Sequence, residues 1–175
     1  MPVYVAFLRA INVTGRFVRM ETLAEAFRRE GHADARTYIN SGNVVFSSRS
    51  RDGARLGARL EAALPAHLGF VSEVFVRSEN EVRAIAGHAQ GLLTQAVEVN
   101  VAFLPAPLTP EQRAALGTLH TALDRFETAG REVYWLCGGP QSESRFSNAV
   151  LERRLRVRST LRRARMLQGL VQALP

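Results

Sequence analysis

Residues 36–46 have the pattern of a β-hairpin, and this stretch constrains the fold more than any other part of the chain. It reads Arg36-Thr37-Tyr38-Ile39-Asn40-Ser41-Gly42-Asn43-Val44-Val45-Phe46, two strand-like runs around an amide-rich turn. A two-residue turn at Ser41-Gly42 would pair Asn40 with Asn43, Ile39 with Val44, Tyr38 with Val45, and Thr37 with Phe46.

Cross-strand partners share a face, so this pairing also predicts which side chains are buried. The face expected to lie against helices carries Thr37, Ile39, Val44 and Phe46. The other face carries Arg36, Tyr38, Asn40, Asn43 and Val45. A turn one residue longer would change both the pairing and the faces.

The segments around the hairpin predict the element order of a ferredoxin-like domain. An apolar strand is expected over Val3–Ile11, and a helix from about Met20 to Glu30, where apolar residues recur every three or four positions. After the hairpin, leucines four residues apart in 56–64 predict a second helix, and Val71–Arg77 predicts a strand. Strand, helix, strand, strand, helix, strand is the split order of ferredoxin-like folds. We assign residues 1–77 to this N-terminal half.

The rest of the chain repeats the same order after a connecting segment. Residues 78–96 read as a helical linker, opened by a capping box of Ser78 and Glu81. From 97 onward the pattern predicts a strand, a helix, a hairpin over 126–137, a further helix, and a period-two segment at 156–162 that fits either strand or coil. A final helix follows. We therefore expect an α+β fold of two ferredoxin-like (βαββαβ) halves, pseudo-duplicated, with an extra C-terminal helix and residues 97–175 as the second half.

Composition narrows the class of protein. The apolar runs are of strand length, far short of the ~20 residues that span a bilayer, and the N-terminus has no signal-peptide pattern, so we expect a cytoplasmic protein with no membrane partner. Cys137 is the single cysteine and lies in an apolar run, which predicts a buried, unreactive thiol and no disulfide. The four histidines, at positions 32, 67, 88 and 120, lie in separate segments without ligand spacing, so neither a metal site nor a cofactor is expected.

Few residues suggest catalysis. The chain has no phosphate-binding glycine loop that ends in Lys and no serine elbow. The aspartates Asp34, Asp52 and Asp124 stand alone in the sequence. Whether the protein is an enzyme, and in which oligomeric state it works, both stay open.

Two polar stretches are expected to meet at one end of the first sheet. In this fold the first and third strands are antiparallel neighbours, so the loop after the first strand approaches the hairpin tip. Arginine guanidiniums and the backbone N–H groups of glycine-containing turns suit a small anionic or phosphorylated ligand. The expected ligand-binding residues are Arg9, Asn12, Thr14, Arg16, Tyr38, Asn40, Ser41 and Asn43. A purely structural role is the alternative, because Asn, Ser and Gly are also ordinary turn residues.

The positive charge of this basic chain is concentrated at its C-terminal end. Residues 145–175 hold eight arginines and one acid, a net +7 that equals the net charge of the whole chain. This segment supports an alternative role in nucleic-acid binding, by contacts to phosphates. The candidate residues are Arg145, Arg158, Arg162, Arg163 and Arg165. As the plainer interpretation, Arg162, Arg163 and Arg165 form the solvated side of a helix.

The stretches 5–13 and 36–46 resemble the opening signatures of the bacterial domain-of-unknown-function 1697 family. Residues 130–134 and 144–152 resemble its later blocks. The resemblance implies paired ferredoxin-like halves and no established activity. The chain departs from the family pattern at Thr14-Gly15, where Gly-Gly is usual, at Arg145, where Lys is usual, and at Arg163-Ala164, where Asn-Trp is usual. With Arg163-Ala164 in that place, the chain has neither the Asn nor the Trp side chain to offer a shared ligand.

Overall fold

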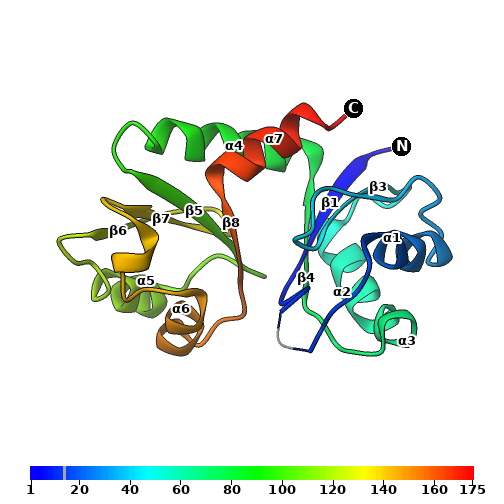
Figure 1. Cartoon of the computed structure of the whole chain (residues 1–175), viewed down its shortest axis with the longest axis horizontal. Helices are drawn as coiled ribbons and strands as arrows, with labels where there is room; N and C mark the ends of the chain where they lie inside the picture. Colours follow the sequence, from blue (N-terminus) through cyan, green and yellow to red (C-terminus); the bar gives the residue numbers. More distant parts are fainter. Residues whose placement is uncertain (14) are drawn as a thin grey trace. The chain divides into compact units, whose positions relative to one another are not determined.

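The computed structural model describes residues 1–13 and 15–175, and the chain divides into two compact units (Figure 1). Unit 1 comprises Met1–Val82 with Leu174–Pro175, and unit 2 comprises Arg83–Ala173. The division falls within one helix, α4 (Glu79–Leu92), which lies in the segment expected to be a helical linker.

Unit 1 is a four-stranded antiparallel sheet with helices on one face. Its elements are β1 (Val3–Leu8), α1 (Met20–Arg29), β2 (Arg36–Thr37), β3 (Asn43–Ser47), α2 (Gly53–Ala63), α3 (Pro65–Leu68) and β4 (Val74–Ser78). The strands lie in the order β2-β3-β1-β4, which is the ferredoxin-like order predicted from the sequence.

The helices of unit 1 pack on alternate residues of the sheet. Tyr4, Ala6 and Leu8 of β1 share a core with Leu23 and Phe27 of α1. Leu56 and Leu60 of α2 join the same core, as the four-residue spacing of the leucines predicts. The Asp52 side chain accepts a hydrogen bond from the backbone N–H of Arg55 and caps the start of α2.

The hairpin forms, but the pairing predicted for it is wrong. Thr37 lies opposite Val44 and Arg36 opposite Val45, so residues 38–42 form a five-residue connection in place of a two-residue turn. The shift equals two residues, which leaves Val44 and Phe46 on the helix-covered face as expected. Ile39, expected to point inward, lies in the connection and is 52% exposed.

Unit 2 repeats the architecture. Its elements after α4 are β5 (Glu98–Phe103), α5 (Pro110–Gly117), β6 (Asp124–Ala129), β7 (Glu132–Cys137), the 3-10 turn η1 (Gln141–Glu143), α6 (Asn148–Leu155), β8 (Thr160–Arg163) and α7 (Ala164–Gln172). The strand order is β6-β7-β5-β8. The open question at 156–162 is thereby settled, because the strand begins at Thr160 and Arg156 ends α6 in a left-handed conformation. Helix α7 is the expected addition.

The core of unit 2 contains a buried carboxylate that sequence reasoning treated as isolated. Asp124 is 3% exposed, and its Oδ1 accepts hydrogen bonds from Trp135 Nε1 and Ser144 Oγ, each at 2.8 Å. Three hydrogen bonds satisfy this acid, since Thr121 Oγ1 donates to Oδ2 at 3.1 Å. Cys137 is fully buried, and burial raises the pKa of its thiol, as expected for an unreactive cysteine.

The pairing registers show that the two units correspond residue by residue. Val5 lies opposite Arg77 in unit 1, and Val101 lies opposite Arg162 in unit 2. Both arginines are buried, and each donates from Nη1 to the carbonyl of the residue before it, at 3.0 Å for Arg77 and 2.8 Å for Arg162. This correspondence sets Leu8 against Leu104. The N–H of Leu8 donates to Gly42 and that of Leu104 to Arg131, each at 2.9 Å.

No helix among the described residues is long and apolar enough to cross a bilayer.

Candidate functional site

The loop after β1 and the tip of the β2–β3 hairpin lie side by side at one end of the unit 1 sheet. Phe7 is the register partner of Asn43, so the end of β1 and the start of β3 are adjacent. The Asn12 side chain reaches the carbonyl of Asn40 at 3.5 Å. Gly42 lies so close to the loop that a Cβ there would stand 2.9 Å from Ile11 Cβ, and its φ is +70°. Glycine is therefore required at this contact.

The two asparagines at the centre of the predicted site maintain the loops. Asn43 is fully buried, and its Nδ2 donates to the Tyr38 carbonyl at 3.1 Å and to Ser41 Oγ at 2.7 Å. Asn12 Oδ1 accepts from the N–H of Val18 at 3.0 Å, closing the loop onto itself. These amides are engaged within the protein, so they position the loops.

The two predicted arginines differ in their surroundings. Arg9 Nη1 lies 3.6 Å from Glu73 Oε2, an ion pair that offsets its charge. Arg16 is half-buried, and its guanidinium forms no ion pair with any residue of 1–13 or 15–175. Arg16 is therefore the cation of this site that is available to an anion. Thr14, also predicted to contact the ligand, lies outside the described residues.

The backbone of these two loops is strained. Ala10 (φ +56°), Asn12 (φ +59°) and Ile39 (φ +49°) occupy the left-handed region that L-residues rarely adopt. The remaining non-glycine residue with positive φ in the described chain is Arg156, in unit 2. This conformation costs Ala10 and Ile39 about 1–3 kcal/mol each, and β-branched Ile39 is the least suited to it, whereas asparagine tolerates it. Strain of this kind clusters at ligand sites, where it is maintained by the surrounding structure.

Unit 2 lacks both loops at the corresponding place. In unit 1 the chain spans residues 9–19 between β1 and α1 and residues 38–42 between β2 and β3. In unit 2 the corresponding connections are residues 104–109 and residues 130–131. Unit 2 thus forms the same fold with a short loop and a two-residue turn. The fold therefore does not require the longer polar loops of unit 1.

Apolar side chains that sequence reasoning missed flank this site. Val13 is 49% exposed and Phe17 is 73% exposed, both on the loop after β1, and Ile39 lies exposed on the hairpin tip. The sequence signal was Phe17 in a polar loop outside the helical apolar spacing. A ligand with an apolar portion beside its charge would contact such residues.

The C-terminal arginines differ in exposure. Arg162 is 8% exposed, and burial lowers the pKa of its guanidinium to about 10. It lies on strand β8, at the end of the 156–162 segment for which strand was one of the two expectations, so the alternative of a solvated helix side is wrong for Arg162. Arg145, Arg158, Arg163 and Arg165 are exposed.

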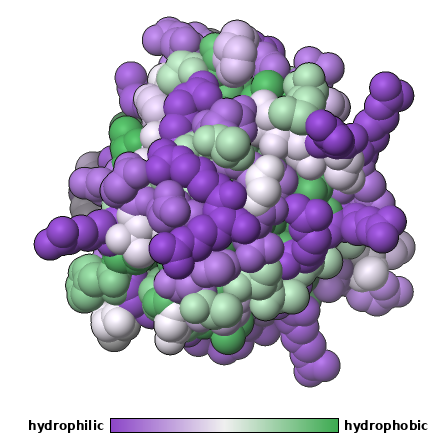
Figure 2. Space-filling model, turned by 90° about the vertical axis from the view of Figure 1, so that its right-hand side faces the viewer, coloured by the Kyte–Doolittle hydropathy of each residue, from purple (hydrophilic) through white to green (hydrophobic). Residues whose placement is uncertain are grey.

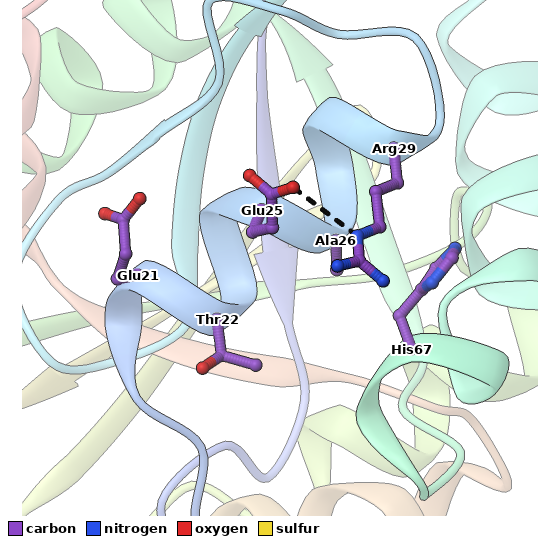
Figure 3. Close-up of a pocket in the computed structure, with 6 residues that line it drawn as sticks. All are labelled: Glu21, Thr22, Glu25, Ala26, Arg29 and His67. Carbon is purple, nitrogen blue, oxygen red and sulfur yellow. Dashed lines mark hydrogen bonds and ion pairs between the residues drawn. The ribbon is translucent and has the colours of Figure 1, made fainter.

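A groove on the outer side of α1 collects charged side chains that bind one another. It has a volume of about 420 Å³ and is lined by Glu21, Thr22, Glu25, Ala26, Arg29 and His67 (Figure 3). Arg29 Nε lies 3.4 Å from Glu25 Oε1, and Arg28 Nη1 lies 2.6 Å from Glu21 Oε1. His67 Nε2 lies 2.8 Å from Glu30 Oε1. Because these charges are paired, we do not assign the groove as a site. Figure 2 shows one face of the molecule, which is largely hydrophilic with scattered apolar groups.

A second polar hollow of about 580 Å³ surrounds buried His32. His32 Nδ1 lies 2.9 Å from the Ser47 carbonyl, and Nε2 lies 3.3 Å from Arg59 Nη2, which fits a neutral ring that donates at Nδ1 and accepts at Nε2. The ring also packs edge-on against Phe46. His32 is thus a bonded core residue. Within residues 1–13 and 15–175, no three His, Cys, Asp or Glu side chains converge as metal ligands.

Comparison with solved structures supports the fold. A conserved bacterial protein, SP0830 from Streptococcus pneumoniae, superposes with a TM-score of 0.80 at 23% sequence identity, over 99% of this chain and 98% of that one. At this identity the likeness establishes the fold alone. A search of curated proteins found no match. The model of a family of proteins of unknown function, DUF1697, matches residues 1–134, and the chain belongs to that family.

Proposed function

We propose that the end of the unit 1 sheet binds a small anionic or phosphorylated ligand between the loop 9–19 and the hairpin connection 38–42. The observation that carries this proposal is the difference between the units. The same fold closes in unit 2 with two short connections, while in unit 1 both are extended, meet each other and hold strained residues. Two independent additions that converge at one place favour a ligand over a connector.

Arg16 would supply the charge and the hairpin tip the neutral contacts. Arg16 has no ion-pair partner in the described chain, so an oxyanion would gain a forked, charged donor there. The side chains of Tyr38, Asn40 and Ser41 lie on the adjacent connection and offer hydroxyl and amide groups. Asn12 and Asn43 act as positioning residues, because their amides hold the two loops in place.

The test measures binding of inorganic phosphate by changes in backbone amide NMR signals. In the native protein we expect saturable shifts at Gly15, Asn40 and Gly42. Arg16→Gln should remove them without lowering thermal stability, while the matched control Arg55→Gln, on the exposed side of α2, should leave them unchanged.

Absence of any shift in the native protein would leave the structural role as the explanation of these loops. Equal loss in Arg16→Gln and Arg55→Gln would indicate a general charge effect and also count against the site.

Nucleic-acid binding is the second candidate function, favoured by the exposure of Arg145, Arg158, Arg163 and Arg165. Contacts to phosphate release counterions, so each lost contact lowers the salt slope of binding by about 0.9 for duplex DNA. We expect a combined change of Arg145, Arg158 and Arg163 to Gln to weaken DNA binding and flatten this slope. An unchanged slope, with Arg49, Arg51 and Arg55 changed to Gln as the control, would exclude this role for the segment.

A further inference from the structure

Unit 2 contains a small pocket that is separate from the site proposed in unit 1. Its volume is about 90 Å³, and it is lined by Leu93, Glu98, Val99, Arg163 and Arg165. Leu93 follows α4, Glu98 and Val99 belong to β5, and the two arginines lie at the junction of β8 and α7. The pocket therefore combines apolar walls with charges of both signs.

The charges in this pocket do not pair with each other. Glu98 Oε2 is buried and has no hydrogen-bond partner. Neither Arg163 nor Arg165 forms an ion pair with a residue of the described chain. A buried carboxylate oxygen without a donor is unfavourable unless a ligand or solvent supplies one, so this group calls for a bound partner.

A third polar group on the same face is also unsatisfied. Asn100 is 3% exposed, and its Nδ2 has no partner. It lies two residues after Glu98 on β5 and is the register partner of Arg163 on β8, so the three side chains share one face of the sheet. In and beside the pocket, the Glu98 carboxylate thus has an oxygen without a donor, and the Asn100 amide has a nitrogen without an acceptor. The arginine guanidiniums there have no carboxylate partner among the described residues.

The corresponding place in unit 1 is filled. The registers set Asn100 against Tyr4, and Arg163 against Ser78. The Tyr4 ring packs against Phe46 with centroids 5.9 Å apart, and its hydroxyl donates to the Ser50 carbonyl at 2.9 Å. Where unit 1 has a large, satisfied side chain, unit 2 has a short amide beside a pocket. The opening is therefore a feature of unit 2 and not of the shared fold.

We propose that this pocket binds a small zwitterion of the α-amino acid class. The ligand's ammonium group would pair with the Glu98 carboxylate, and its carboxylate would accept from Arg163 and Arg165. A short apolar side chain would lie against Leu93 and Val99. The pocket is small, about 90 Å³, which suits a ligand of about alanine's size.

The experiment titrates three probes of similar size into the whole chain and follows backbone amide signals. The probes are L-alanine, with both charges, alaninamide, with the ammonium alone, and propionate, with the carboxylate alone. We expect saturable shifts at Val99 and Arg163 with L-alanine, and at least about tenfold weaker binding of the other two. Glu98→Gln and Arg163→Gln should each weaken L-alanine binding by a similar factor, while exposed Arg153→Gln should not.

Thermal melting of each variant shows that it remains folded, so a loss of binding is interpretable. No shift with L-alanine would overturn the proposal and indicate that water alone fills the pocket. Propionate binding as tightly as L-alanine, with Glu98→Gln unaffected, would show an anion site and also overturn it. Unit 1 signals at Gly15 and Gly42 distinguish this pocket from the site proposed there.

Discussion

The two units share a topology and a register, yet they carry their irregular polar features at opposite ends of the sheet. Unit 1 extends the connections next to the end of β1. Unit 2 closes that end with a short loop and a two-residue turn, and instead leaves unsatisfied polar atoms near the start of β5, at Glu98 and Asn100. The shared frame is held by strand pairing and helix packing, so either end of it can vary at little cost to stability.

The buried arginines illustrate what the two units have in common. Arg77 and Arg162 occupy corresponding positions, and both donate to the carbonyl of the preceding residue. A buried guanidinium is costly to desolvate, so its presence in both units marks a feature of the common frame. The loops and the pocket, which occur in one unit each, mark where the units differ.

The largest effect is expected where the two units differ in a core position. Tyr4→Ala should cost about 3–5 kcal/mol of unfolding free energy, because it removes a buried ring and leaves a cavity. The corresponding change in unit 2, Asn100→Ala, should cost less than about 1 kcal/mol, because Asn100 Nδ2 has no partner to lose. Chemical denaturation of both variants measures the difference. Similar costs would contradict the claim that unit 2 is open at this position.

The turn glycines give the next comparison. Gly42→Ala combines a positive φ with a Cβ 2.9 Å from Ile11, and should cost about 3 kcal/mol. Gly130→Ala in unit 2 has a positive φ, but its nearest contact would be 3.5 Å, from Glu132, so about 1–2 kcal/mol is expected. Thermal melting of the pair checks the order. A larger loss of stability for Gly130→Ala than for Gly42→Ala would contradict the tight contact between Gly42 and Ile11.

Asparagine substitutions test whether the hairpin tip is held by Asn43. Asn43→Ala should cost about 2 kcal/mol, since a fully buried side chain loses hydrogen bonds to Tyr38 and Ser41. Asn40→Ala, on the exposed part of the same connection, should change stability by less than about 0.5 kcal/mol. Amide exchange rates of the tip should rise in the first variant alone. If Asn43→Ala left both stability and amide exchange unchanged, Asn43 would not hold the tip, and its side chain would instead be a candidate for ligand contact.

The smallest effect is expected when a thiol reagent is added to the native protein, whose single cysteine is Cys137. Burial raises the pKa of its thiol, so less thiolate is present at a given pH than for a free cysteine, and the side chain is fully covered. A thiol reagent at mildly alkaline pH should modify the denatured chain and leave the native one unlabelled. Rapid labelling of the native protein would contradict this prediction and show that the core of unit 2 opens readily to solvent.

Much of the fold was predictable because its signals are local. The spacing of Leu56, Leu60 and Leu64, the capping residues and the apolar strands predicted both halves and the added helix. The meeting of the Asn12 loop with the hairpin tip also followed from the sequence, since the predicted order makes β1 and β3 neighbours.

Tertiary structure alone decided the hairpin register, and there is a physical reason. Side chains alternate with a period of two, so a shift of two residues keeps Val44 and Phe46 on the same face, and the hydrophobic pattern cannot distinguish the two pairings. Two contacts that the hydrophobic pattern does not record favour the observed pairing. The buried Asn43 amide bonds the Tyr38 carbonyl across the connection, and Gly42 approaches Ile11 from outside the hairpin. The burial of Arg162, Asp124 and Asn100 depended likewise on neighbouring strands that are distant in sequence, which no local pattern records.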